Sequence, residues 1–212
     1  MKICCIADTH QLHHLLDIPE CDVLVCAGDY DLSVEWDMDR LNYWFVTLKD
    51  KVGKIVFIAG NHDFALQKSN SILIEHVFTN AIYLEDSSVT IDGVKFYGTP
   101  WCPMFHSWAF METHDFLKEN REKIPEDTDV LISHCPPFGI MDHVSRANGD
   151  PGQSQGCASL RNRIKLIKPK LSVFGHIHEG RGQYTDYATD YVNASIMDEM
   201  YSPVNSPILT TI

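Results

Sequence analysis

The chain has 212 residues, of which 44% are hydrophobic and 22% are charged. This ordinary globular composition excludes a disordered, collagen-like or coiled-coil protein, and we expect one domain over residues 1–212 because no stretch rich in Pro, Gly or Ser divides the chain. The formal net charge of −12 argues against a nucleic acid polymer as the partner.

Apolar segments and cysteines indicate the cellular location of the protein. No stretch approaches 18 uninterrupted apolar residues, so we expect no membrane partner, and the first apolar run is too short for a signal peptide. Seven cysteines form an odd set without C-x-x-C spacing, and Cys4, Cys5 and Cys26 lie in apolar runs. We therefore expect a reducing, cytoplasmic location.

The first half of the chain alternates apolar runs with a helical pattern. Residues 3–7, 23–27 and 54–59 are apolar and end at polar or Gly residues, which is typical of buried strands. Residues 37–49 repeat apolar side chains at the helical period of about 3.6, which predicts an amphipathic helix. The local unit is therefore β-α-β, with helices on at least one face of the sheet.

The second half adds a hairpin and further α/β units. Asp92-Gly93 between two expected strands is a strong hairpin signal. This order predicts a mixed α/β fold in which sheet layers pack between helices. The expected elements are strands at 81–84, 88–91 and 94–98, a helix at 112–123, a strand at 129–133, a long exposed loop at 146–156, a helix at 160–168, a strand at 171–174 and paired strands within 182–193.

Polar clusters follow the expected strands at their carboxyl ends. Ligands bind outside these ends in α/β sheets, so we expect clusters that are distant in sequence to converge. One such Asp, Asn or His alone is more typical of a turn, a helix cap or a surface residue, but five clusters after five strands favour a shared site. The clusters are Asp8-Thr9-His10, Gly28-Asp29, Gly60-Asn61-His62-Asp63, Ser133-His134 and Gly175-His176-Ile177-His178.

The residue types in these clusters are typical of transition-metal ligands. Carboxylates with imidazoles suit Mn²⁺, Fe or Zn²⁺ better than Mg²⁺ or Ca²⁺, which prefer oxygen ligands. The set is too large for one tetrahedral zinc ion, so two adjacent ions bridged by one carboxylate are expected. We expect Asp29 to be the bridge and Asn61 to contribute a neutral oxygen.

The ordered set resembles the signature of the calcineurin-like metallophosphoesterases, which is D-x-H, G-D, G-N-H-[DE], a His and then G-H-x-H. The resemblance runs from Asp8 to His178. It implies a four-layer α/β/β/α sandwich with a di-metal site at the carboxyl ends of the strands. It further implies one ion held by Asp8, His10, Asp29 and His178, and a second ion held by Asp29, Asn61, His134 and His176.

Downstream segments resemble the small phosphodiesterases of the metallophosphoesterase-domain subgroup, whose members hydrolyse cyclic nucleotides or aryl phosphodiesters. These segments are Gly98-Thr99-Pro100-Trp101, Trp108-Ala109-Phe110, His134-Cys135-Pro136-Pro137-Phe138-Gly139, Gly175-His176-Ile177-His178-Glu179-Gly180 and Val192-Asn193-Ala194-Ser195. The resemblance implies a metal-dependent phosphodiesterase that hydrolyses small phosphodiesters, such as cyclic nucleotides, through a metal-bridging hydroxide. Mn²⁺ is the expected ion, and Fe, Ni²⁺ or Zn²⁺ suits the same ligands.

Two other functions stay open at this point. The same di-metal centre serves a phosphomonoesterase, including a protein phosphatase. A catalytically weak binding module of this fold is the second alternative, although a complete ligand set argues against it. The sequence leaves protein partners open.

Catalytic roles are expected for two residues beside the ligands. His62 follows Asn61 and can protonate or stabilise the leaving oxygen, unless it is a further metal ligand or a turn residue. Asp63 is expected to orient the His62 ring. Asp31 is expected to have no role, because the chain lacks the longer G-D-x-x-D-x-G form of many larger relatives.

Substrate contacts are open as well. Trp101, Phe105, His106 and Trp108 form an aromatic segment on which a base could stack, although core packing explains the same residues equally well. Arg146 and Arg181 either meet a phosphate or are solvated surface charges.

Overall fold

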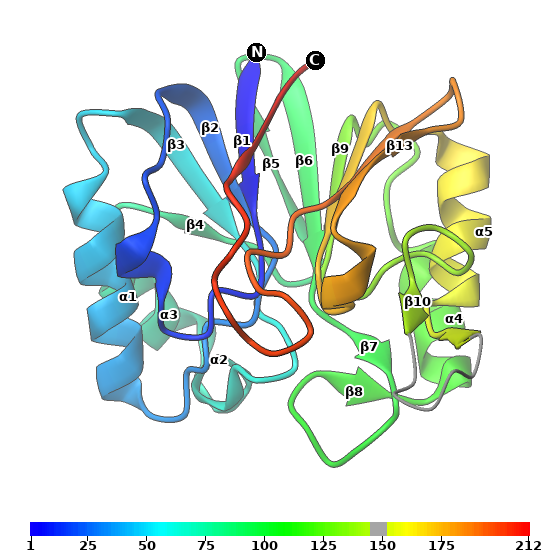
Figure 1. Ribbon diagram of the computed structural model, residues 1–212, viewed down its shortest axis with the longest axis horizontal. Helices are drawn as coiled ribbons and strands as arrows, with labels where there is room; N and C mark the ends of the chain where they lie inside the picture. The colour runs from blue at the N-terminus through cyan, green and yellow to red at the C-terminus, as the bar shows by residue number, and fades with distance from the viewer. Residues whose placement is uncertain (145–151) are drawn as a thin grey trace.

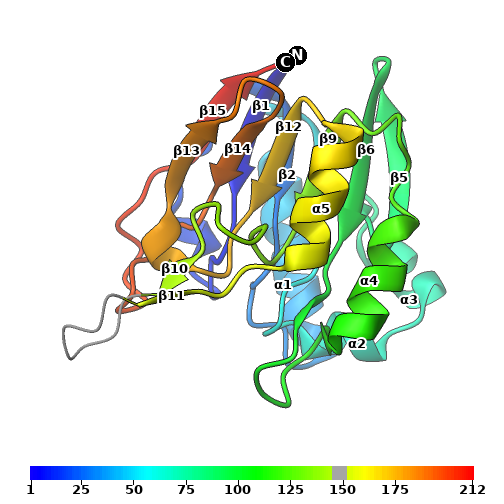
Figure 2. The same cartoon turned by 90° about the vertical axis from the view of Figure 1, so that its right-hand side faces the viewer.

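The computed structural model describes residues 1–144 and 152–212 and stacks two β-sheets face to face between two layers of helices (Figure 1). Helices α1, α2 and α3 cover the outer face of one sheet, and α4 and α5 cover the outer face of the other (Figure 2). The predicted α/β/β/α sandwich is therefore confirmed.

The first sheet has the order β15-β1-β2-β3-β4. Strands β1 to β4 run parallel, and β15 pairs antiparallel with β1. The strands expected at 3–7, 23–27 and 54–59 are confirmed, each beginning one or two residues earlier. The elements are β1 (Lys2–Ile6), β2 (Cys21–Cys26), β3 (Val52–Phe57), β4 (Ile82–Tyr83) and β15 (Ile208–Thr211), with α1 (Glu35–Thr47), α2 (Phe64–Lys68) and α3 (Ser71–Val77).

The second sheet has the order β13-β14-β12-β9-β6-β5. Strands β5 and β6 form the predicted hairpin, with Asp92 and Gly93 at φ values of 48° and 81°, which suit a tight two-residue turn. The elements are β5 (Ser87–Ile91), β6 (Val94–Thr99), β9 (Val130–Ser133), β12 (Leu171–Phe174), β13 (Gly182–Thr185) and β14 (Asp190–Asn193), with α4 (His114–Glu122) and α5 (Ala158–Ile167).

Three clusters of buried side chains fill the three spaces between the four layers. In β1, Cys4 and Ile6 face the helices α1 to α3, whereas Ile3 and Cys5 face the second sheet. Because both faces of this strand are covered, its sequence is continuously apolar rather than alternating.

Several short elements have no clear sequence pattern and were not expected. They are η1 (His13–Leu15), β7 (Cys102–Pro103), β8 (Met111–Glu112), β10 (His143–Val144), β11 (Gln153–Ser154) and η2 (His178–Gly180). Within the loop expected at 146–156, only residues 152–156 are described, and β11 lies among them. Among the described residues, no helix has the length and apolar character needed to cross a bilayer.

The parallel strands of both sheets end at one edge, at the bottom of Figure 1. There Ala7, just after β1, forms a β-bridge with Ser195, just after β14, so the two sheets meet. Two glycines allow close approach at this edge. A Cβ atom at Gly60 would overlap the Asp29 carboxylate, and one at Gly175 would overlap the Asp8 carboxylate.

Candidate metal centre

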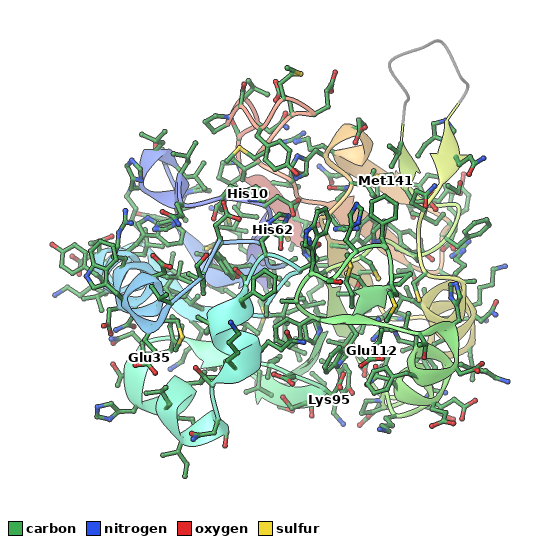
Figure 3. All side chains as sticks on the ribbon, turned by 90° about the horizontal axis from the view of Figure 1, so that it is seen from below. His10, Glu35, His62, Lys95, Glu112 and Met141 are labelled. Atoms are coloured by element: carbon green, nitrogen blue, oxygen red, sulfur yellow. The ribbon has the colours of Figure 1, made fainter. Side chains whose placement is uncertain are left out.

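The loops after β1, β2, β3, β9 and β12 bring the predicted polar clusters together. His10 and His62 lie next to each other at the centre of this edge when it is seen from below (Figure 3). Ligand atoms of Asp8, Asp29 and His134 lie within 4.8 Å of one another, although the three residues come from different strands. The expected convergence is therefore observed.

The backbone is turned sharply at several of these residues. Asp8, His10, Asp29 and His176 have φ values of 54°, 41°, 58° and 68°, in the left-handed region that non-glycine residues adopt infrequently. This geometry interrupts the alternation of a strand and directs consecutive polar side chains to the same edge. Such strain concentrates at functional sites, where surrounding contacts hold it.

The first ligand group consists of Asp8, His10 and His178, whose ligand atoms lie within 4.8 Å of one another. His10 Nδ1 donates to Asp31 Oδ1 at 3.0 Å, and His178 Nδ1 donates to the Asp198 carbonyl at 2.9 Å. Both rings are thereby fixed through Nδ1, which leaves each Nε2 as a candidate ligand atom. His10 Nε2 is buried without a hydrogen-bond partner among the described residues.

The second candidate ligand group is the predicted set of Asp29, Asn61, His134 and His176. His134 Nδ1 donates to the Ala27 carbonyl at 2.8 Å. His134 Nε2 lies 2.9 Å from Asn61 Oδ1 and 3.2 Å from Asp29 Oδ2, so this nitrogen faces two acceptor oxygens. A neutral ring cannot satisfy both oxygens, whereas a cation at this point contacts all three atoms.

The pKa values of His134 and His176 reflect how closely the charged and ionisable groups lie in the second ligand group. Burial alone would lower the pKa of His134, but the carboxylates of Asp29 and Asp8 outweigh it and raise the pKa to about 9. Burial and the neighbouring His134 lower the pKa of His176 to about 3. The carboxylates therefore favour the protonated ring of His134, whereas burial and His134 disfavour protonation of His176.

The two ligand groups fit divalent ions on independent grounds. Their donor set of carboxylates, imidazoles and one amide suits first-row transition metals. The buried His10 Nε2, an atom that can bind a metal, has no hydrogen-bond partner among residues 1–144 and 152–212.

Cys102 was missed by the sequence analysis, and its sulfur lies within 4.8 Å of ligand atoms of His134 and His176.

Asp63 does not orient the His62 ring as expected. Its buried carboxylate accepts backbone N–H groups from Asp29, Tyr30, Leu32 and Gly60, at 2.7 to 3.2 Å. Both oxygens are thus engaged with the main chain, and Asp63 joins the loop after β2 to the loop after β3. Its role is to hold these loops in position.

Asp31 corrects the opposite expectation, that this residue has no role. Its Oδ1 accepts from His10 Nδ1 and lies 3.5 Å from His62 Nδ1. Asp31 therefore contacts both the first ligand group and the expected catalytic histidine. The signal in the sequence was its spacing of two residues from Asp29, and its φ of 61° brings the side chain to the same edge.

The aromatic segment divides into core and surface residues. Trp101 packs against Phe110 and Phe116 and donates through Nε1 to Asp86 at 2.8 Å, so it is structural. Phe105 is 70% exposed, and the Trp108 ring centroid lies 5.0 Å from that of His62.

Of the two candidate arginines, the structure describes Arg181 only. Arg181 Nη2 donates to the Ser206 carbonyl at 2.8 Å. Arg146 lies outside the described residues.

Tyr201 is a further residue that the sequence analysis missed. It lies in the segment between β14 and β15, and its ring centroid is 4.9 Å from those of His10 and His178. No periodic pattern marks this segment in the sequence. It reaches the centre because β15 returns to pair with β1.

Known proteins share this arrangement of sequence and fold. The profile of the family described as calcineurin-like phosphoesterase matches residues 1–180. Human and mouse metallophosphoesterase domain-containing protein 1 are each 37% identical to this chain over 233 residues, covering 98% of the chain and 70% of each relative. The crystal structure of phosphopantetheinyl hydrolase (PptH) from Mycobacterium tuberculosis has the same fold, with a TM-score of 0.60 at 14% identity, covering 98% of this chain and 95% of that one. The chain therefore belongs to the calcineurin-like phosphoesterase family, a family of phosphoric ester hydrolases.

Proposed function

We propose that this protein is a metal-dependent phosphodiesterase that hydrolyses small phosphodiesters, with cyclic nucleotides among its substrates. The observation that carries the proposal is the contact between the two ligand groups, in which Asp8, Asp29 and His134 lie within 4.8 Å of one another. Two ions held side by side are the arrangement that hydrolytic phosphoesterases use.

In this proposal the first ion is held by Asp8, His10, Asp29 and His178. The second ion is held by Asp29, Asn61, His134 and His176, with Asp29 shared. Divalent ions held by these residues would supply positive charge for the phosphate and would lower the pKa of an attacking water. Mn²⁺ is the preferred ion, and Fe, Ni²⁺ and Zn²⁺ suit the same ligands.

His62 is the proposed acid for the leaving oxygen. Its side chain is 28% exposed, so a substrate can reach the ring. Asp31 lies 3.5 Å from Nδ1, and the His62 backbone N–H donates to Asp29 Oδ1 at 2.8 Å. Nε2 lies 4.0 Å from Asp29 Oδ2 and so faces the proposed centre, which makes it the atom that we propose holds the proton for the leaving group.

Charge supports a small substrate. Two divalent ions exceed the charge of Asp8 and Asp29, so the loaded centre is locally cationic and attracts a phosphate. The net charge of −12 repels a long polyanion from the rest of the surface. A small monoanionic diester meets both conditions.

Two further inferences concern the whole chain. A reducing, cytoplasmic location stays a prediction, supported by seven cysteines that are all free and buried. Residues 1–212 as one domain also stay a prediction, supported by an inter-sheet core that joins residues from Ile3 to Ile208.

The test is hydrolysis of bis-p-nitrophenyl phosphate, p-nitrophenyl phosphate and cyclic nucleotides by protein reconstituted with Mn²⁺. We expect the diesters to be hydrolysed faster than the monoester, and Asn61→Ala to lose this activity. Asn80→Ala is the matched control, because Asn80 is exposed and bonds only to Thr79 in the described structure. Turnover of the monoester alone would indicate a phosphomonoesterase, and metal binding without turnover would indicate a binding module.

A further inference from the structure

The loop of residues 104–108, here called the aromatic loop, is exposed at the metal centre. Met104 and Phe105 are 60% and 70% exposed, and Trp108 is 36% exposed. The loop is anchored at both ends, because Met104 N donates to the Glu112 carbonyl and Ala109 N donates to the Asn61 carbonyl, each at 3.0 Å. The backbone of a proposed metal ligand therefore fixes the position of Trp108.

A continuous row of rings connects the aromatic loop to the metal centre. Each ring centroid lies 4.3 to 5.2 Å from that of the next ring. The row passes through both the first ligand group and the proposed acid. Its members, in order, are Tyr201, His10, His62, Trp108, His106 and Phe105.

Exposure alone does not indicate binding, because single exposed apolar residues are ordinary on protein surfaces. Trp36, on α1, is 64% exposed and is covered by the Arg40 guanidinium at 4.9 Å. Trp108 differs because its ring adjoins His62, whose own ring contacts His10. Trp108 is therefore the ring that adjoins the proposed acid, on the side where the leaving group of a phosphate held at the centre would lie.

The residues of the aromatic loop also indicate the chemistry of that substituent. The sequence Met-Phe-His-Ser-Trp carries neither Lys nor Arg, so it offers ring faces rather than fixed positive charge. Flat groups stack on such faces and gain affinity beyond the area they bury. An alkyl or sugar substituent of the same charge gains much less.

We propose that Trp108, supported by His106 and Phe105, is a stacking platform for a planar aryl or heteroaryl substituent of the substrate. This inference rests on the proposed function, because the phosphate must lie at the two ligand groups. It assigns recognition of the flat aromatic group of such a substrate to Trp108. Tyr201 is the ring at the opposite end of the row.

The test compares binding of phenylphosphonate and methylphosphonate to the Mn²⁺-loaded protein by calorimetry. Both phosphonates resist hydrolysis and differ in the ring alone. We expect phenylphosphonate to bind about tenfold more tightly to the wild type. We expect Trp108→Ala to remove the preference for phenylphosphonate and to leave methylphosphonate binding unchanged. We expect Trp108→Phe to retain most of the preference for phenylphosphonate. Trp36→Ala is the control and changes neither affinity.

The platform is overturned if the wild type binds both phosphonates equally or binds neither. It is also overturned if Trp108→Ala weakens both equally, because that result indicates damage to the centre. Failure of the proposed function gives a different result. In that case the phenyl preference depends on Trp108, but no diester is hydrolysed.

Discussion

The two ligand groups differ in what holds their histidines. In the second group, His134 is fully buried and its Nδ1 bonds to a main-chain carbonyl of Ala27. In the first group, His178 likewise bonds to a main-chain carbonyl, that of Asp198, but His10 bonds to the side chain of Asp31, which is 36% exposed. Asp31 also adjoins the His62 ring.

This difference separates a rigid half of the centre from an adjustable half. A main-chain carbonyl after β2 moves only if the sheet moves, so the second group is fixed by the fold. In the first group, His10 is held through an ionisable side chain that also contacts the proposed acid, so the adjustable half is the side of the centre formed by His10, Asp31 and His62. Substitutions in the second group are therefore expected to cost stability, and those around Asp31 are expected to change the chemistry.

The largest effect is expected from His134→Ala. In metal-free protein this change leaves the buried Asp29 carboxylate without its imidazole partner, which costs about 3 kcal/mol of unfolding free energy. Hydrolysis of the diester should also be lost. Urea unfolding in the presence of a chelator, beside an activity assay, measures both. His76→Ala is the control, because His76 is exposed on α3. Equal stability of the two variants would contradict the inference that the second ligand group is fixed by the fold.

His62→Ala is expected to lower kcat by about 10²- to 10⁴-fold, the usual contribution of a general acid. Metal content and unfolding free energy should stay at wild-type values, because the side chain is partly exposed and is not one of the proposed ligands. Elemental analysis and steady-state kinetics check both. Loss of metal from this variant would show that His62 is a ligand instead.

Asp31→Asn is expected to have a smaller effect, about 10- to 100-fold in metal affinity or activity. The amide oxygen still accepts from His10 Nδ1, but the negative charge beside His10 and His62 is lost. The pH profile of kcat should change with it, whereas the unfolding free energy should not. An unchanged pH profile of kcat would contradict the inference that Asp31 adjusts the chemistry of His10 and His62.

The smallest effect concerns acid stability outside the centre, at His13. Burial, with the charges of His14 and Arg40, lowers the pKa of His13 to about 4. The unfolded chain binds this proton at higher pH, so stability falls as the pH decreases from 6.5 towards 4. Between pH 6.5 and 5 the loss is about 1.5 kcal/mol. His13→Leu should remove this part of the pH dependence of the unfolding free energy, measured by urea unfolding at several pH values. Equal pH dependence in the wild type and the variant would contradict the prediction.

Most of the fold follows from the sequence because its strands are short apolar runs that end at polar clusters. The proposed ligands follow from the same pattern, since Asp8, Asn61 and His134 each come soon after a strand. Parallel strands place such residues at one edge without any further information. The register of the apolar runs then determines which cysteines and aliphatic residues fill each core.

The remaining roles depend on contacts that no local pattern encodes. Asp31 and Asp63 are both acidic residues near a ligand, and only the direction of each carboxylate distinguishes them. Asp63 turns toward buried backbone N–H groups, and Asp31 turns toward two imidazoles. In the same way, burial separates Trp101 from Trp108, and the return of β15 brings Tyr201 to the centre.

The decisive measurement is the number of Mn²⁺ ions bound per chain, by elemental analysis after reconstitution and gel filtration. A centre built from two adjoining ligand groups predicts two ions for the wild type and one ion for His134→Ala. A wild type that retains one ion or none, or a variant that retains two, would contradict a di-metal centre at this edge.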